Sequence, residues 1–180
     1  EDDKKKGLLY AGTETGIYVS WNDGKKWEKF NLNLPVTPIL DLMVKHDDLI
    51  VATSGRAFWV LDDLGLLRQF KGKSNRAMLY KPEDAYLANG GSPLNRSSKD
   101  FDGTQSLSGV NPANGVVIYY SLPEVPDSVE IGLEIYDSEG KMVNSFSSKR
   151  DKTFKSYSGG PSPAPVISKD EGLNRFVWNM

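Results

Sequence analysis

The chain has 180 residues, and its formal net charge of −2, without a basic stripe, argues against nucleic-acid binding. It contains no cysteine, which excludes disulfides, zinc–thiolate sites and thiol catalysis. No apolar run approaches the roughly 20 residues that a membrane helix needs, and frequent aromatic residues without helix-length patterns favour β structure.

Short apolar runs separated by turn signals fill the first part of the chain. Residues 1–6 are a charge run that we expect to be a solvated loop or a frayed end. Strands are predicted at 7–12 and 16–21, and a return strand at 26–30. Between them, Asn-Asp-Gly at 22–24 is typical of a tight turn, because Asn and Gly accept positive φ.

The same order of elements then begins again. Strands are predicted at 38–45, 49–53 and 57–61, a polar turn at 46–48, and a closing segment at 66–70. Leu8–Ser20 parallels Leu49–Leu61, at a spacing of 41 residues between Leu9 and Ile50. A period of about 40–50 residues with short strands is what β-propeller blades produce. The first unit lacks an opening strand, so we expect the chain to begin within a blade.

A polar stretch at 89–114 separates this region from a second β region, and we expect it to be a long loop at a domain boundary. Beyond it, strands are predicted at 115–122, 129–136, 141–146 and 174–180. The segment 129–136 alternates apolar and polar residues, which indicates a half-buried strand. The expected domains are therefore 1–75 (blades), 76–114 (linker and loop) and 115–180 (a β-sandwich).

Residues 20–27, Ser-Trp-Asn-Asp-Gly-Lys-Lys-Trp, resemble the Asp-box, Ser-x-Asp-x-Gly-x-Thr-Trp. The matching positions are Ser20, Gly24 and Trp27, while Asn22 stands in place of Asp and Lys26 in place of Thr. The short polar side chain would hold the turn through backbone N–H groups, and the Trp would pack under the hairpin. With residues 7–70, this motif resembles terminal repeats of BNR-type propellers of the sortilin and sialidase-like superfamily, in which the box is structural and away from any active site.

Residues 109–180 resemble the immunoglobulin-like domain of flagellar hook-capping proteins and of many secreted bacterial proteins. The resemblance rests on three strings: Leu-Pro at 122–123, Ile-Tyr-Asp with Gly-Lys at 135–141, and Gly-x-Asn-x-x-x-Trp at 172–178. Members of that family continue beyond this Trp, so the resemblance implies an incomplete sandwich. The expected fold class is all-β: the last two blades of a propeller plus a partial immunoglobulin-like sandwich.

Several residues could carry chemistry, but each has a plainer interpretation. His46, Asp47 and Asp48 could ligate a metal, although neighbours on one turn rarely face one ion. Asp62 and Asp63 could be a hydrolytic carboxylate pair, although adjacent strand residues point to opposite faces. Asp41 could be a buried functional acid, with an outward position as the default. One histidine assembles no convincing Ser-His-Asp set, and the Gly-rich segments lack nucleotide-binding spacing.

Two residues are candidates for ligand binding. Arg56 lies in an inter-strand turn of the kind that rims a propeller face, and Trp59 follows it. Trp21, Trp59 and Tyr18 could stack on sugars, although strand aromatics more often belong to the core.

No catalytic, cofactor or metal residue is predicted. The hypothesis is a non-catalytic binding or scaffold segment of a bacterial secreted, periplasmic or cell-surface protein that recognises glycan or protein. The alternative is the C-terminal part of a propeller-type glycoside hydrolase whose acids lie upstream, and a sorting-receptor-like role is not separable from the first hypothesis. Expected partners are further blades or another copy of the chain, with neither nucleic acid nor a membrane span.

Overall fold

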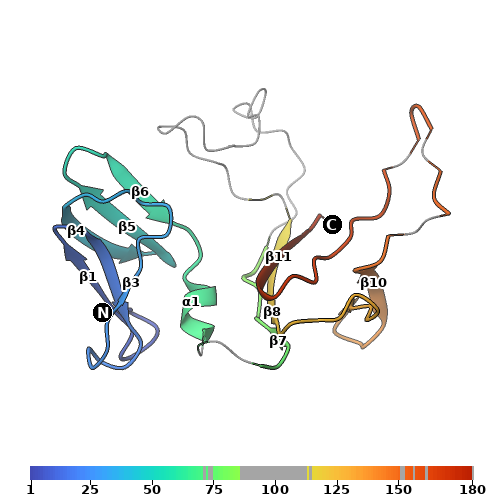
Figure 1. Ribbon diagram of the computed structural model, residues 1–180, viewed down its shortest axis with the longest axis horizontal. Helices are drawn as coiled ribbons and strands as arrows, with labels where there is room; N and C mark the ends of the chain where they lie inside the picture. The colour runs from blue at the N-terminus through green and yellow to red at the C-terminus, as the bar shows by residue number, and fades with distance from the viewer. Residues whose placement is uncertain are drawn as a thin grey trace. The chain divides into compact units, whose positions relative to one another are not determined.

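The computed structural model describes residues 1–70, 72, 75–85, 113, 115–150, 153–155, 157–160 and 162–179. The chain forms two compact units, Glu1–Phe70 and Lys71–Met180, each with its own hydrophobic core (Figure 1). Both units are built almost entirely from small antiparallel sheets, so the all-β prediction is confirmed. The predicted loop at 89–114 lies outside the described residues except for residue 113.

Unit 1 contains two three-stranded sheets and one short helix. The first sheet has the order β1-β2-β3, with β1 (Leu9–Thr13), β2 (Gly16–Ser20) and β3 (Glu28–Lys29). The second has the order β4-β5-β6, with β4 (Ile39–Lys45), β5 (Asp48–Thr53) and β6 (Phe58–Leu61). Both are meanders, because each strand pairs with the next one along the chain.

Turn chemistry sets the register of the second sheet. Lys45 pairs with Asp48, which leaves His46 and Asp47 as a two-residue loop with φ of 50° and 71°. Two successive positive φ values are typical of the type I′ turn, whose twist matches that of the flanking strands. The polar turn predicted at 46–48 is therefore a tight hairpin turn.

The two sheets pack together around Ile17, Leu34, Leu49, Val51 and Leu64. Gly12 of β1 lies directly against β4, since a Cβ at Gly12 would stand 2.6 Å from Ile39 Cγ2. The alternating burial of β5 shows why this sheet has an inner and an outer face: Leu49, Val51 and Thr53 are buried, and the residues between them are only half-buried.

The sequence repeat reappears in the strand registers, with one adjustment. Tyr10 pairs with Val19 in the first sheet, and Ile50 pairs with Val60 in the second. The Thr13 hydroxyl donates to the Gly16 carbonyl (2.9 Å) and the Thr53 hydroxyl to the Ala57 carbonyl (2.7 Å), which makes β1 equivalent to β5 at a shift of 40 residues and β2 equivalent to β6 at a shift of 41. The uniform shift of 41 used for the sequence misaligns β1 with β5 by one residue, which would exchange the two faces of the strand.

Two local expectations for unit 1 gain detail. The segment expected at 66–70 to close the second repeat lies in a helix, α1 (Gly65–Gln69), at whose start Asp63 Oδ1 accepts a hydrogen bond from the Gly65 N–H (2.9 Å). The N-terminal charge run is a loop, as one of its two expected forms, but it is not fully solvated: Asp2 is 4% exposed, and its N–H donates to the Leu8 carbonyl at 2.8 Å.

Unit 2 contains a three-stranded sheet and a hairpin. The sheet has the order β11-β8-β7, with β7 (Met78–Leu79), β8 (Val116–Leu122) and β11 (Gly172–Trp178). The hairpin joins β9 (Gly132–Tyr136) to β10 (Met142–Ser147) through a turn in which Asp137 Oδ1 accepts hydrogen bonds from the Glu139 and Lys141 N–H groups, both at 2.9 Å.

The core of unit 2 lies between this sheet and the hairpin. Ile118, Tyr120, Leu122, Ile167 and Phe176 are buried, and Phe146 of the hairpin meets Phe176 with ring centroids 4.7 Å apart. The predicted strand at 129–136 is shorter than expected, because β9 starts only at Gly132 and Val129 is exposed. Met180, predicted in the last strand, lies outside the described residues.

Candidate functional site

The Asp-box-like turn joins β2 to β3 through side-chain hydrogen bonds. Asn22 Oδ1 accepts hydrogen bonds from the Lys26 N–H (2.8 Å) and the Ser20 hydroxyl (3.0 Å). Ser20 is fully buried, and its Oγ accepts a hydrogen bond from the Gly24 N–H at 3.0 Å. The positive φ angles fall on Asp23 (60°) and Gly24 (78°), rather than on Asn22 and Gly24. Every one of these polar groups is used to hold the turn.

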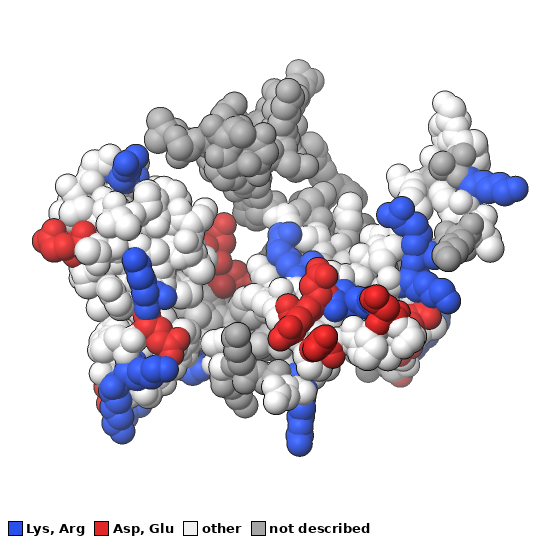
Figure 2. Space-filling model, in the orientation of Figure 1, with Lys and Arg blue, Asp and Glu red and all other residues white. Residues whose placement is uncertain are grey.

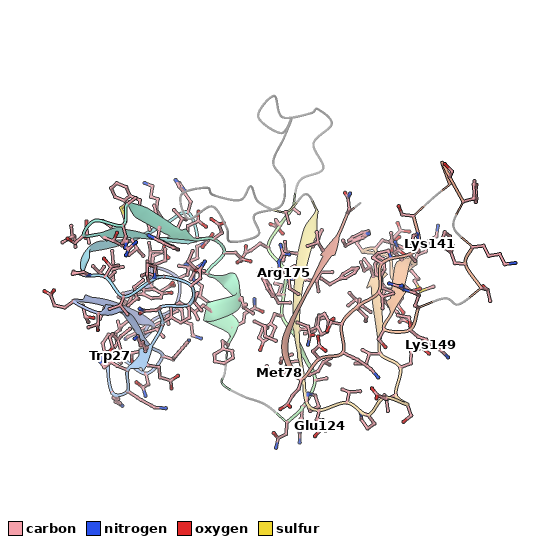
Figure 3. All side chains as sticks on the ribbon, turned by 45° about the horizontal axis from the view of Figure 1, so that its top comes forward. Trp27, Met78, Glu124, Lys141, Lys149 and Arg175 are labelled. Carbon is pink, nitrogen blue, oxygen red and sulfur yellow. The ribbon has the colours of Figure 1, made fainter. Side chains whose placement is uncertain are left out.

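Trp27 does not form the buried plug expected beneath the hairpin. Its ring lies beside Gly24, 3.8 Å from an ideal Cβ at that position, but the residue is 40% exposed. In Figure 3 it lies at the margin of unit 1, next to the blue strands. Trp27 stands directly before β3, whose two residues are themselves exposed.

The two candidate binding residues are neighbours, but only Arg56 presents its side chain to solvent. The Trp59 indole N–H donates to the Arg56 carbonyl (2.8 Å), and the ring packs against the core of unit 1. Trp21 is similarly engaged, through a hydrogen bond to the Leu67 carbonyl (3.3 Å) and a ring contact with Phe70 at 5.8 Å. Both tryptophans are therefore half-buried, with their indole N–H groups already engaged within the chain.

An ion cluster ties the N-terminal segment to α1 and to the β4–β5 turn. Arg68 Nε donates to both carboxylate oxygens of Asp2 (2.9 and 3.1 Å), Nη2 donates to Asp3 (3.1 Å) and Nη1 to Asp47. Lys4 Nζ adds a second ion pair to Asp47 at 2.6 Å. The charged groups of the predicted solvated segment and of the predicted solvated turn therefore neutralise one another.

The pKa values in this cluster follow from its geometry. Burial alone would raise the pKa of Asp2, but hydrogen bonds from Arg68 and from the backbone of Lys4 and Lys5 outweigh it and lower that pKa. Hydrogen bonds from Lys4 and Arg68 lower the pKa of Asp47. Burial, followed by the charge of Asp2, raises the pKa of Tyr10, whose hydroxyl donates to Asp2 at 3.3 Å. All three groups stay in one protonation state near neutral pH, which fits a structural role.

The other candidate acids do not converge on one point. Asp63 Oδ1 accepts a hydrogen bond from the Gly65 N–H (2.9 Å), and the Asp63 N–H donates to Asp48 Oδ1 at 3.1 Å. Burial and then the charges of Asp48 and Asp63 raise the pKa of Asp62. Asp41 is exposed on β4, as the default interpretation expected. Among the described residues, acidic and histidine side chains form no group suited to a metal ion.

The most distinctive surface of unit 1 is the outer face of the β4-β5-β6 sheet, which we call the outer face. Its apolar members include Leu40, Met43, Phe58 and Val60, which are 70%, 51%, 77% and 54% exposed. Half-buried Ile50 lies between Met43 and Val60 in the strand register. In the view of Figure 2, much of the visible surface of the body that carries these strands is uncharged, and Lys, Arg, Asp and Glu side chains are interspersed in it.

Sequence reasoning missed Phe58, the most exposed aromatic residue of unit 1 among the large hydrophobic residues described. The sequence held a signal for the exposure of Phe58. Strand neighbours point to opposite faces, so a Trp59 that faces the core puts Phe58 on the opposite face. An exposed apolar patch of this kind marks an interaction surface more often than a catalytic one.

Unit 2 has an apolar cavity of about 240 Å³ between its sheet and its hairpin. Its lining includes Met78 of β7, Tyr120 and Leu122 of β8, and Leu133 of β9. The Tyr120 hydroxyl is already engaged, because it donates a hydrogen bond to the Ser168 carbonyl at 2.6 Å. The described lining of this cavity therefore offers apolar contact area and no side chain that could act as an acid, a base or a nucleophile.

Comparison with known proteins gives no match, whether against family models, curated proteins or solved structures. Within the described parts of the chain, no helix has the length and apolar character needed to cross a bilayer.

Proposed function

We propose that this chain is a non-catalytic binding or scaffold segment of a secreted or cell-envelope bacterial protein, and that its outer face binds protein. The observation that carries the proposal is the exposed apolar sheet face formed by Leu40, Met43, Phe58 and Val60. An exposed sheet face whose most exposed members are apolar suits another protein surface better than a glycan, because sugars need polar partners as well as aromatic rings.

The internal repeat supports a blade-like origin for this face. Ile50, Ala52, Phe58 and Val60 of the second sheet are the equivalents of Tyr10, Gly12, Ile17 and Val19 of the first. In the first sheet this face is covered, because Ile39 and Leu42 lie against Gly12, and Ile17 belongs to the buried core. In the second sheet its equivalent faces outward. Stacked sheets related by a repeat are the arrangement of a β-propeller, and the two-layer core of unit 2 suits an immunoglobulin-like sandwich.

The test compares wild type with Phe58→Asp and Arg56→Ala on two probes, a glycan array and the dye 1-anilinonaphthalene-8-sulfonate. We expect dye fluorescence that Phe58→Asp reduces and Arg56→Ala leaves unchanged, together with no glycan retention. Array binding that is lost in Arg56→Ala and kept in Phe58→Asp would move the binding surface to the β5–β6 turn. Release of reducing ends from soluble polysaccharides by this chain would contradict a non-catalytic role.

A further inference from the structure

We propose that the edge of β9 in unit 2 is a docking site for an extended peptide, which pairs with β9 as an additional strand. The peptide inserts aliphatic side chains into the apolar cavity of unit 2 and carries Lys or Arg at the alternate positions. The site uses no residue of the outer face, so it is tested independently of the proposed function.

The hydrogen bonds of the β9–β10 hairpin direct some backbone groups of β9 away from β10. The Ser148 N–H donates to the Ile131 carbonyl at 2.9 Å, so these two residues form a hydrogen-bonded pair. Bonded and non-bonded pairs alternate along an antiparallel ladder. Gly132 and Glu134 therefore belong to non-bonded pairs, and their N–H and C=O groups point to the far edge of β9.

A contact on the other edge of the hairpin confirms this alternation. The Ile167 N–H donates to the Ser147 carbonyl at 3.2 Å, and Ser147 is the ladder partner of Gly132. Because the Ser147 carbonyl points away from β9, the backbone groups of Gly132 point away from β10. Among the described residues, no hydrogen bond reaches the edge of β9 at Gly132 or Glu134. This edge can accept another strand.

The edge strand β7 lies on the other side of the cavity, and its core-facing side chain is uncovered. Leu79 pairs with Tyr120 of β8, so both side chains are on the face that carries the core of unit 2. Tyr120 is 6% exposed, whereas Leu79 is 65% exposed. Because β7 and β9 both line the cavity, side chains of a strand added to β9 would reach the space beside Leu79.

The cavity specifies aliphatic residues in the peptide. Its lining joins Leu79 and Leu122 of the first sheet to Ile131 and Leu133 of the hairpin. A cavity of about 150 Å³ holds a benzene-sized group, so one of about 240 Å³ has room for one or two aliphatic side chains. In a strand paired with β9, the residue opposite Leu133 shares its face, so alternate peptide residues point into the cavity.

Charge complementarity specifies the residues between them. Glu130 and Glu134 lie on the exposed face of β9, and neither forms an ion pair within the described residues. The register extended by two residues sets Lys149 opposite Glu130, whereas Glu134 faces Ser145 and accepts a hydrogen bond from the neutral Tyr136 hydroxyl. A peptide Lys or Arg beside Glu134 would therefore form a favourable cross-strand pair.

The cations next to β7 do not oppose this arrangement. Arg76 and Lys81 flank β7, and each already takes part in an interaction. The peptide residue beside Glu134 points to the exposed face of the hairpin, away from the sheet that contains β7.

The probe is the fluorescein-labelled peptide Lys-Val-Lys-Val-Lys-Val-Lys, and its binding to the whole chain is measured by fluorescence anisotropy. The contact is much smaller than the about 800 Å² per partner of an ordinary stable interface, so we expect a Kd on the order of 100 µM. The control peptide Lys-Lys-Val-Val-Val-Lys-Lys has the same composition without the alternation. It should bind on the order of tenfold more weakly, because its valines cannot all share one face.

Amide hydrogen exchange gives a readout that non-specific attraction would not produce. The alternating peptide should slow exchange at the Gly132 and Glu134 N–H groups, which point to the free edge. Exchange at Leu133 and Ile135, whose N–H groups already point to β10, should change little.

Two substitutions test the two kinds of contact. Leu79→Asp places a carboxylate beside the inserted side chains and should raise Kd by on the order of tenfold. Glu134→Lys should raise Kd by about threefold and strengthen binding of Glu-Val-Glu-Val-Glu-Val-Glu by a similar factor. The matched controls are Leu173→Asp, 56% exposed on the other face of the same sheet, and Glu139→Lys in the β9–β10 turn, and both should leave Kd unchanged.

Alternating protection along β9 that Leu79→Asp abolishes would support the proposal. Slow exchange at Gly132 and Glu134 in the free chain would overturn it, because the edge would already be paired. Equal binding of the two lysine peptides, or a Kd that Leu79→Asp leaves unchanged, would overturn it as well. Each of these results leaves the dye-binding test of the outer face unaffected.

Discussion

Asn22 holds the turn between β2 and β3 through a single carbonyl oxygen. That oxygen accepts hydrogen bonds from Lys26 N–H and from the buried hydroxyl of Ser20, so the amide N–H₂ of Asn22 is not needed for the turn. An acidic side chain in the same place would offer the same oxygen with a full charge, and charge-assisted hydrogen bonds are the stronger kind.

Asn22→Ala removes this oxygen, so the Lys26 N–H and the proton of the buried Ser20 hydroxyl both lose their acceptor. We expect a loss of about 1–2 kcal/mol in the free energy of unfolding. Asn22→Asp keeps both hydrogen bonds and should be as stable as wild type or more so. Chemical denaturation followed by tryptophan fluorescence measures both changes, and equal losses in the two variants would show that the side-chain oxygen does not hold the turn.

The ion pairs of Arg68 make the free energy of unfolding of unit 1 depend on pH in the acid range. The pKa of Asp2 and that of Asp47 lie below the ordinary 3.8 in the folded protein. The folded state therefore binds fewer protons than the unfolded chain as these carboxyls titrate. The stabilisation is fully present above the ordinary carboxyl pKa, and it is lost as the pH falls through the lowered folded values.

Arg68→Met leaves Asp2 buried without its main partner and should cost about 3 kcal/mol at neutral pH. Without Arg68 the pKa of Asp2 is no longer lowered by that hydrogen bond and charge, so the deficit relative to wild type should shrink as the pH is lowered. Thermal melts from neutral to acid pH measure this change. Arg175→Met removes the same charge from an exposed position on β11 and serves as the control, and a constant deficit at every pH would argue against the cluster.

The contact between β1 and β4 shows how elements are matched to one another. A Cβ at Gly12 would stand 2.6 Å from Ile39 Cγ2 and 2.9 Å from Ile39 Cβ, which is closer than packed atoms approach. The small residue in β1 lets the second sheet approach, and Ile39 fills the space. This pairing brings the sheets of the two repeats together in one core.

Gly12→Ala should therefore destabilise unit 1 by about 1–3 kcal/mol, because the second sheet must shift outward. Gly132→Ala is the matched control: it is also a strand glycine, but its nearest neighbour to a new Cβ is the Phe146 carbonyl oxygen at 3.9 Å. Urea unfolding of the two variants gives the comparison. A loss in Gly132→Ala as large as that in Gly12→Ala would mean that strand glycines matter for reasons other than this contact.

The molecule as a whole contains two cores that share no residue. Phe176 is buried in the second core, where it meets Phe146. Phe176→Ala should cost about 3 kcal/mol and raise hydrogen exchange in β8 and β11. The amides of β5, in the first core, provide an internal reference within the same sample. Faster exchange in β5 to the same extent would show that the two units unfold as one.

Much of the local structure was predictable from the sequence because it depends on short-range periodicity and turn chemistry. The alternation along 129–136 indicated which residues of β9 face the core, and the polar residues at 46–48 marked a hairpin turn that the structure contains. The repeat of strands 8–20 in 49–61 likewise follows from pattern alone, apart from the one-residue difference in the intervening turn.

Only the tertiary structure decided the rest, because it depends on residues far apart in the sequence. Arg68 and Asp2 are separated by 66 positions, and nothing in a run of charges shows that one of them will be buried by a partner on a helix. The closing segment expected at 66–70 lies in the helix α1, in a setting where the Leu64 N–H donates to the Asp47 carbonyl at 2.7 Å. The outer face could be recognised only once the inner face was known, since an apolar strand residue is exposed or buried according to what packs against its sheet.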